Sequence, residues 1–230
     1  LSNKLSNKLL ELVMIVKNSG HLIIDTLRHI KPIINYYTIL DTGSTDNTIE
    51  DIKNCLEGVD GHIFQEPFVD FSTSRNRSLD LSQGHCKYQI ILDDTYIVNG
   101  AIKLKELLLT HDYPGLALKI QNHTDNVYFS HRIIRTKDNI RYKYKVHELL
   151  QFKDEKDTYI IDNPHIFIYD KVNPYMLSRT QSRLYNDIKS LKEDLELYEN
   201  DSRILCYLGL LYYKLNEYKE ATDYFNRCIN

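Results

Sequence analysis

The sequence predicts an α/β protein with a mostly parallel sheet, followed by an all-helical tail. Three observations support this prediction. Short apolar runs rich in β-branched residues alternate with helical stretches over residues 12–92, strand-like runs separated by polar turns cover residues 116–169, and residues 175–229 have helical periodicity alone. Strands and helices joined by short connections are typical of a parallel sheet with helices on both faces.

The first part of the chain supplies the parallel sheet. Leucine and isoleucine recur at helical spacing after the first strand until Pro32, which ends that helix. The second helix places Ile49, Ile52 and Leu56 on one face. The predicted strands are residues 12–16, 36–40, 62–65 and 88–92, and the predicted helices are residues 21–31, 47–56 and 73–82.

The middle of the chain has a different sequence pattern. A helix over residues 101–109 follows Asn99-Gly100. Strand-like runs then occupy residues 116–120, 127–134, 142–146 and 159–169, separated by polar turns. These runs predict an antiparallel or mixed edge added to the parallel core.

The tail resembles a helical repeat. One long helix is predicted over residues 175–199, and a helix pair follows it with Asn216-Glu217 in the turn. Tetratricopeptide spacing is shown by Leu208, Gly209, Tyr212, Ala221 and Phe225. We therefore expect a lead-in over residues 1–10, a domain over residues 11–173, and a helical linker with a partial repeat over residues 174–230.

Composition limits the function and the compartment. The 230 residues carry a net charge of −3, which disfavours binding to a nucleic acid polymer. The four cysteines lack metal-type spacing, so we expect free thiols and a cytoplasmic location. No run reaches the roughly 18 apolar residues of a membrane-spanning segment, and the polar start does not resemble a secretory signal.

Polar segments follow three of the predicted parallel strands: Lys17-Asn18, the loop Asp41–Asp46, and Asp93-Asp94-Thr95. Ligands of open parallel sheets bind at the carboxyl ends of the strands. The order of the strands is not evident from the sequence, but loops at one edge can converge. These three segments are therefore the predicted binding region.

The Asp41–Asp46 loop contains one glycine, Gly43, among small hydroxyl residues, and a helix follows directly. Such a loop could hold a phosphate at the helix N-terminus. The leading aspartate instead favours a neutral N–H or O–H donor as the ligand. In the alternative interpretation, Ser44 or Asp46 only caps the helix.

The Asp93-Asp94 pair follows the most apolar strand. Two adjacent carboxylates repel each other, so their pKa values diverge unless a cation lies beside them. Oxygen ligands together with a diphosphate suit Mg²⁺ or Mn²⁺. The alternative is an acidic turn without a ligand.

Four segments in order resemble the family 2 glycosyltransferases of the GT-A fold, in the branch with C-terminal tetratricopeptide repeats. They are Leu12–Asn18, Ile39–Thr48, Phe71–Arg77 and Ile91–Asp94. The resemblance implies inverting transfer of a sugar from a nucleotide-sugar, usually a UDP-sugar, to a hydroxyl acceptor, with a divalent metal.

The resemblance also implies roles for individual residues. Asp41 would recognise the base, Arg75 would hold the nucleotide, Asp93 would contact the ribose or diphosphate, and Asp94 would ligate Mn²⁺ or Mg²⁺. The further donor-binding candidates are Lys17, Asn18, Gly43 and Asp46.

Two segments depart from the pattern of that branch. Many of its members read Asp-Ala-Asp-Glu where this chain reads Asp-Asp-Thr-Tyr from Asp93, so Asp93, Asp94 and Thr95 all remain possible metal ligands. Ser19-Gly20 stands where relatives often have a glutamate after Lys17-Asn18.

The general base is predicted further along the chain. Val146-His147-Glu148 resembles a Val-His-Glu element of this branch, which implies that Glu148 is the base and His147 a metal ligand or acceptor contact. A solvated strand end is the alternative. His131 and Arg132 are lesser candidates for contact with the diphosphate, and His165 is a second candidate ligand.

Two other functions compete with sugar transfer. A catalytically silent domain of this fold could serve as an interaction module, with the repeats binding a protein. A nucleotidyltransferase shares a similar sheet, but it usually has a glycine-rich basic loop after the first strand. For a transferase the acceptor would be a glycan or a protein, and the helical region could mediate a homodimer or a protein contact.

Overall fold

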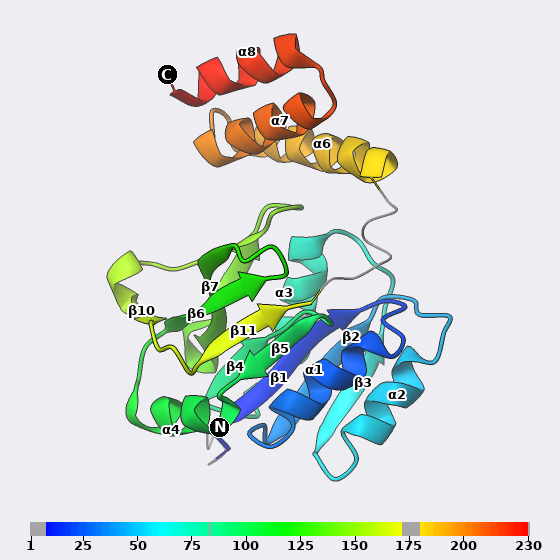
Figure 1. Ribbon diagram of the computed structural model, residues 1–230, viewed down its shortest axis with the longest axis vertical. Coiled ribbons are helices and arrows are strands. Elements are labelled where there is room, and N and C mark those ends of the chain that lie inside the picture. Colours follow the sequence, from blue (N-terminus) through cyan, green and yellow to red (C-terminus); the bar gives the residue numbers. More distant parts are fainter. Residues whose placement is uncertain (1–7, 83, 172–179, 230) are drawn as a thin grey trace. The chain divides into compact units, whose positions relative to one another are not determined.

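The computed structural model describes residues 8–82, 84–171 and 180–229, which form two compact units (Figure 1). The first unit contains residues 8–69, 73–142 and 150–171 of this part of the chain. The second contains residues 70–72, 143–149 and 180–229. Two short segments from the range predicted for the first domain therefore belong to the helical unit.

The first unit is built on a nine-stranded sheet with the order β3-β2-β1-β4-β7-β6-β11-β5, in which β10 also pairs with β6. A separate two-stranded sheet is formed by β8 (Arg141–Lys143) and β9 (Leu149–Gln151). The nine strands are β1 (Leu10–Val16), β2 (Tyr36–Asp41), β3 (Gly61–Gln65), β4 (Tyr88–Ile91), β5 (Tyr96–Asn99), β6 (Gly115–Asn122), β7 (Val127–Arg135), β10 (Thr158–Ile161) and β11 (Phe167–Asp170). Short 3₁₀ turns cover Thr136–Asp138 and Glu155–Asp157.

Parallel pairing dominates one half of the sheet, as predicted. Strands β3, β2, β1 and β4 are parallel neighbours. Antiparallel pairing is not confined to the edge, however, because β7 lies between β4 and β6 and is antiparallel to both. The reason is the turn over residues 123–126, which folds β7 back along β6 as a hairpin.

Helices cover both faces of this sheet (Figure 1). Alternate residues of β1 point to opposite sides, as the strand repeat requires. Leu10, Leu12 and Met14 pack with α1 (Leu22–Ile30), α2 (Thr48–Cys55) and α4 (Ala101–Thr110). Val13 packs on the other side with Leu79 of α3 (Phe71–Leu81). The predicted α/β class is confirmed.

The strands differ in three details from the runs seen in the sequence. Strand β5 was missed because it has only four residues and directly follows the polar Asp93–Thr95 turn. The run 142–146 is not a strand beyond Lys143, since Tyr144 has a φ of 70°. The run 159–169 forms two strands, β10 and β11, separated by a turn.

The second unit contains the helices α6 (Thr180–Leu197), α7 (Ser202–Lys214) and α8 (Tyr218–Ile229). Gly209 of α7 permits a close approach to α8, because a Cβ at this position would lie 2.6 Å from the ring of Phe225. The helix pair with its turn at Asn216-Glu217 is confirmed, and the predicted start of the long helix at Tyr175 lies outside the described residues. The identification as a tetratricopeptide repeat stays a prediction.

Two further expectations concern cysteines and membranes. All four cysteines are free thiols, and Cys86 is the buried one. No helix among residues 8–82, 84–171 and 180–229 is long and apolar enough to cross a membrane.

Candidate functional site

The strand order brings the three predicted polar segments to one edge of the sheet. Strand β1 lies between β2 and β4, and all three run parallel. Lys17 follows β1 directly, Asp41 ends β2, and Asp93 comes two residues after β4. The carboxyl ends of three neighbouring strands therefore supply the candidate donor-binding residues. Lys17 is exposed at this edge.

Hydrogen bonds join the segment after β1 to the loop after β2. The backbone N–H of Asn18 donates to Ser44 Oγ at 2.9 Å, and the Asn18 side-chain oxygen accepts the N–H of Thr45 at 2.8 Å. The N–H of Gly20 donates to Asp46 Oδ2 at 3.1 Å. The structure therefore brings Asn18 and Asp46 together, two of the predicted donor-binding residues.

The alternative capping interpretation is correct for only one of its two residues. Asp46 Oδ1 accepts the N–H of Thr48 at 3.1 Å and its hydroxyl at 2.6 Å, so Asp46 caps the start of α2. Ser44 instead uses its hydroxyl to hold the segment after β1. The hydrogen bonds of Asp46 lower the pKa of its carboxyl, although burial works in the opposite direction.

Asp41 is fully buried and shapes its own loop. Its carboxylate accepts the backbone N–H groups of Gly43 at 3.3 Å and Ser44 at 3.1 Å. Gly43 has a φ of 105°, which only glycine adopts readily, and open space surrounds the position of a Cβ there. Glycine at this position is thus required by the backbone of the turn.

Asp93 lies between two arginines. Arg75 of α3 donates to Asp93 Oδ1 at 2.6 Å, and Arg132 of β7 has its guanidinium 3.7 Å from Oδ2. Burial would raise the pKa of Asp93, but the charges of Arg75 and Arg132 outweigh it and hold the pKa at about 2. The Arg75 and Arg132 side chains are only 6% and 13% exposed, so two guanidinium groups are largely buried at this edge of the sheet.

A β-bulge aims Arg132 at this cluster. The register between β6 and β7 shifts at Leu116/Ala117, where Arg132 is the extra residue. A bulge re-aims a side chain that regular pairing would send elsewhere. Arg132 donates to Tyr96 Oη at 3.0 Å and lies 4.9 Å from the centre of the Tyr96 ring. His131, the neighbouring candidate for contact with the diphosphate, packs against Phe152 with 4.6 Å between the ring centres.

Asp94 and Thr95 differ from Asp93 in their partners. Burial raises the pKa of Asp94, Ser19 opposes this rise, and the charge of Asp93 adds to it. The Thr95 hydroxyl donates to Asp170 Oδ1 at 2.7 Å. The predicted divergence of the two aspartate pKa values is therefore present, because only Asp93 has arginines beside it.

His147 and Glu148 belong to the helical unit. His147 has a φ of 54°, and its ring stacks on Tyr207 at 4.1 Å with an interplanar angle of 5°. Burial lowers the pKa of the imidazole, and its Nε2 atom is buried without a hydrogen-bond partner within the described residues.

Sequence reasoning missed two members of the Asp93 cluster. Tyr96 lies on the short strand β5, and Asp170 lies at the end of β11, opposite Tyr96 in the register. Their proximity depends on the pairing of β11 with β5, and no local motif indicates it. Burial raises the pKa of Asp170, while the hydrogen bond from Thr95 opposes this rise.

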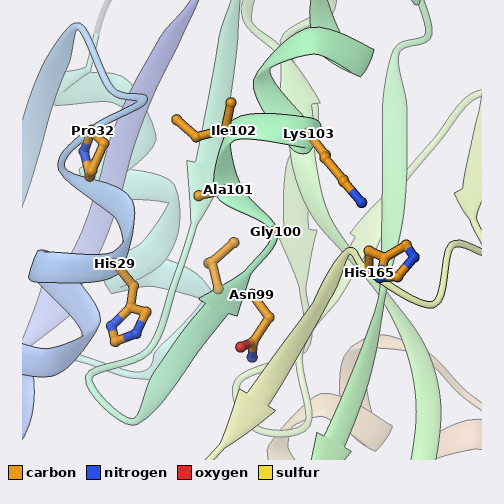
Figure 2. Close-up of a pocket in the computed structure, with 9 residues that line it drawn as sticks. His29, Pro32, Asn99, Gly100, Ala101, Ile102, Lys103 and His165 are labelled. Atoms are coloured by element: carbon orange, nitrogen blue, oxygen red, sulfur yellow. The ribbon is translucent and has the colours of Figure 1, made fainter.

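A separate cavity of about 530 Å³ lies where β5 meets α4. Figure 2 shows His29 on one side and His165 and Lys103 on the other. Apart from His165, the lesser ligand candidate, none of the predicted site residues lines this cavity.

Across the part of the chain that the structure describes, no three His, Cys, Asp or Glu side chains form a cluster that could hold a metal ion. A bound divalent cation would therefore need oxygen ligands from water or substrate in addition to protein carboxylates. Mg²⁺ commonly binds in this way, through one or two carboxylates and substrate phosphates.

Comparisons with known proteins add to this geometry. No protein-family profile matches the chain. The chain is 27% identical over 228 residues to the SPbeta prophage-derived glycosyltransferase SunS of Bacillus subtilis strain 168, and the match covers 94% of this chain. The glycosyltransferase SunS of Bacillus phage SPbeta matches equally well. The chain spans about half the length of these curated relatives, 52% in both cases.

Solved structures show a similar fold. S. aureus TarS 1-349 in complex with UDP-GlcNAc superposes with a TM-score of 0.59 at 15% identity, over 88% of this chain and 71% of that one. The UDP complex of the same protein gives a TM-score of 0.57 at 14% identity, over 94% of this chain and 89% of that one. The mixed α/β fold of the chain is thus similar to that of TarS.

Proposed function

We propose that the chain is a glycosyltransferase that moves a sugar from a UDP-sugar to a hydroxyl acceptor with inversion, assisted by a divalent metal. The observation that carries this proposal is the Asp93 cluster at the carboxyl edge of the parallel strands. Buried positive charge at this edge suits a nucleoside diphosphate. The likeness to SunS and to the UDP-bound TarS structure supports the same activity.

The loops after β1 and β2 are the proposed base-binding region. Each Asp41 oxygen has lone pairs beyond those used by the turn, so the carboxylate can accept the uracil N–H. This contact requires the Gly43 turn to open, because Asp41 is fully buried. Asn18 and Asp46 hold the two loops together, and exposed Lys17 supplies a positive charge at the same edge.

Arg75 and Arg132 are proposed to bind the diphosphate. Both arginine side chains are largely buried beside Asp93, and a guanidinium carries a planar fork of N–H donors that matches phosphate oxygens. Asp93 holds the arginines in place and can accept a ribose hydroxyl.

Asp94 is the proposed metal ligand among the three neighbouring candidates. Asp93 is engaged by arginines and Thr95 by Asp170, whereas Asp94 is a half-buried carboxylate without a cation beside it in the described residues. Mn²⁺ or Mg²⁺ bound here would neutralise charge on the leaving diphosphate. His147 is the second proposed ligand, because burial favours its neutral, metal-binding form.

Glu148 is the proposed general base. In an inverting transfer the base removes the proton from the acceptor hydroxyl as its oxygen attacks the anomeric carbon, and the bond to the diphosphate breaks on the opposite side. The acceptor is proposed to be a glycan or a protein. The helical unit, as a tetratricopeptide-like element, is the proposed surface for a protein partner or a second copy.

Thermal unfolding with nucleotides tests this proposal. UDP, GDP and CMP are each added with and without Mn²⁺, and we expect a Mn²⁺-dependent rise in melting temperature with UDP alone. A panel of UDP-sugars is then scored for UDP release. UDP binding without release from any sugar supports the silent interaction module, and the absence of a shift with every nucleotide contradicts the proposed function.

A further inference from the structure

The segment Lys143–Leu149 (the 143–149 loop) folds with the helices of the second unit. Two of its residues, Tyr144 and His147, have left-handed backbone conformations with φ values of 70° and 54°. Such conformations are unfavourable for residues other than glycine and persist only where surrounding contacts impose them. The contacts that impose them here come from α6 and α7.

Helix α6 holds the loop through a buried carboxylate. The backbone N–H of Lys145 donates to Asp194 Oδ2 at 2.7 Å. Asp194 is only 2% exposed, so this hydrogen bond satisfies a charged group that would otherwise be costly to bury. The Lys145 ammonium also pairs with Glu193 at 2.6 Å.

The N-terminus of helix α7 provides a second attachment. Asp201 caps α7 by accepting the N–H groups of Arg203 and Ile204 through Oδ1. Its other oxygen, Oδ2, accepts the Tyr144 hydroxyl at 2.6 Å. One side chain thus fixes both the helix end and the loop.

Three contacts surround the Val146-His147 step. Val146 is 5% exposed and packs in the apolar cluster of the helices. Arg203 donates to the His147 carbonyl oxygen at 3.1 Å, and its guanidinium lies 5.0 Å from the centre of the Tyr207 ring, on which the His147 ring stacks. The backbone and ring of His147 and the side chain of Val146 are therefore all held by α6 and α7.

We infer that α6 and α7 form a positioning platform for catalysis, with Asp194 and Arg203 as positioning residues for Glu148. This inference rests on the proposed function, which makes Glu148 the general base. A base must be held within hydrogen-bonding reach of its proton, so fixing the backbone on both sides of His147 limits the conformations from which Glu148 acts. The helical unit thereby contributes to turnover, in addition to any partner that it binds.

The inference is tested with Arg203→Ala, Arg203→Lys and Asp194→Asn. The matched control is Arg227→Ala, because Arg227 lies over the Tyr224 ring at 5.3 Å much as Arg203 lies over Tyr207, but on α8. UDP release from the active UDP-sugar gives kcat and KM, and calorimetry gives the Kd for UDP. Hydrogen exchange reports the order of residues 143–149.

We expect Arg203→Ala to lower kcat by about ten- to one-hundredfold while KM and the Kd for UDP stay within about twofold. Arg203→Lys should recover part of kcat, since a lysine still donates to the His147 carbonyl. Both Arg203→Ala and Asp194→Asn should speed exchange in the loop, and Arg227→Ala should change neither quantity. If Arg203→Ala does not fold, the values of kcat and of loop exchange in Asp194→Asn and Arg203→Lys test the inference instead.

An unchanged kcat in Arg203→Ala, or an equal loss in Arg227→Ala, overturns the inference. If the wild-type protein releases no UDP from any UDP-sugar, the proposed function fails and the catalytic role of the platform fails with it. Hydrogen exchange in residues 143–149 then still tests whether α6 and α7 hold the loop. Unchanged exchange in both variants shows that α6 and α7 do not hold the loop.

Discussion

Two carboxylates, one in the sheet and one just after strand β4, show how neighbours decide the charge of a desolvated acid. Glu11 lies in β1 and is fully buried, and its carboxylate accepts the Thr38 hydroxyl at 2.7 Å. Burial raises its pKa to about 7, although the hydroxyls of Thr38 and Ser82 oppose this rise. Asp93 is also desolvated, but Arg75 and Arg132 hold its pKa at about 2.

The difference between these sites indicates which end of the sheet is built for a charged ligand. Hydroxyl groups alone do not keep Glu11 fully ionised, so that part of the sheet tolerates a partly protonated acid near pH 7. Two guanidinium groups keep Asp93 charged, and such groups also donate strongly to phosphate oxygens. The Asp93 cluster therefore offers cationic donors for a nucleoside diphosphate, whereas the partners of Glu11 are hydroxyl groups.

Removal of Arg75 should produce the largest change. Arg75→Ala leaves Asp93 with the more distant Arg132. Asp93 is 31% exposed, so the loss should lie near the lower end of the range for buried pairs, about 3 kcal/mol. We expect a loss of this size in the free energy of unfolding, measured by urea denaturation at pH 7. Arg75→Lys keeps the positive charge, so its free energy of unfolding should fall by less. Equal losses of stability in the two variants would show that the charge of Arg75 does not stabilise Asp93.

Loss of the charge at Asp94 should abolish most turnover while leaving the fold intact. Asp94→Asn removes the proposed metal ligand, so UDP release should fall by about one-hundredfold, which corresponds to about 2.7 kcal/mol in activation free energy. The effect of Mn²⁺ on the melting temperature with UDP should disappear. If Thr95→Ala abolishes the Mn²⁺ effect and Asp94→Asn does not, the ligand assignment is wrong.

Glu11 predicts a pH-dependent stability of defined sign. Its pKa in the folded protein, about 7, lies above the ordinary value of 4.5, so folding favours the protonated acid. This contribution is complete below about pH 4.5 and is lost as the pH rises through 7. Glu11→Gln should therefore be more stable than the wild type at pH 8 by roughly 3 kcal/mol and similar to it at pH 4.5. An equal stability difference at both pH values, measured by urea denaturation, contradicts this assignment.

The Asp41 turn should show the smallest effect on stability. Asp41→Ala removes acceptors for two backbone N–H groups in a loop, which costs about 1 kcal/mol. UDP binding should weaken more than the stability change implies, because the proposed base contact is lost as well. Calorimetric titration checks this, and an unchanged Kd would remove Asp41 from the base-binding site.

The sequence could predict the parallel half of the sheet and the residues carried by local motifs. Asp41, Arg75 and Asp93 stand out because each lies in a short segment with its own pattern of neighbours. The other residues reach the site through tertiary features. Arg132 is placed by the bulge in β7, Tyr96 by the four-residue strand β5, and Asp170 by the pairing of β11 with β5. These contacts depend on register between distant segments, which periodicity does not reveal.

The 143–149 loop shows the same limit in another form. Its alternating pattern predicted a strand, yet Tyr144 and His147 have left-handed conformations. The reason lies in Asp194, Asp201 and Arg203, which follow about 50 residues later and hold the loop from α6 and α7. Tertiary contacts override local propensity at this segment.

Titration of UDP with Mn²⁺ into three proteins tests the central claim most directly. Wild type, Arg75→Ala and Glu11→Gln are compared by calorimetry at pH 7. We expect UDP to bind the wild type and Glu11→Gln with equal Kd and to bind Arg75→Ala at least tenfold more weakly, because Arg75, unlike Glu11, lies in the proposed diphosphate site. Absence of binding to the wild type, or equal Kd values in all three proteins, would contradict a nucleotide site at the Asp93 cluster.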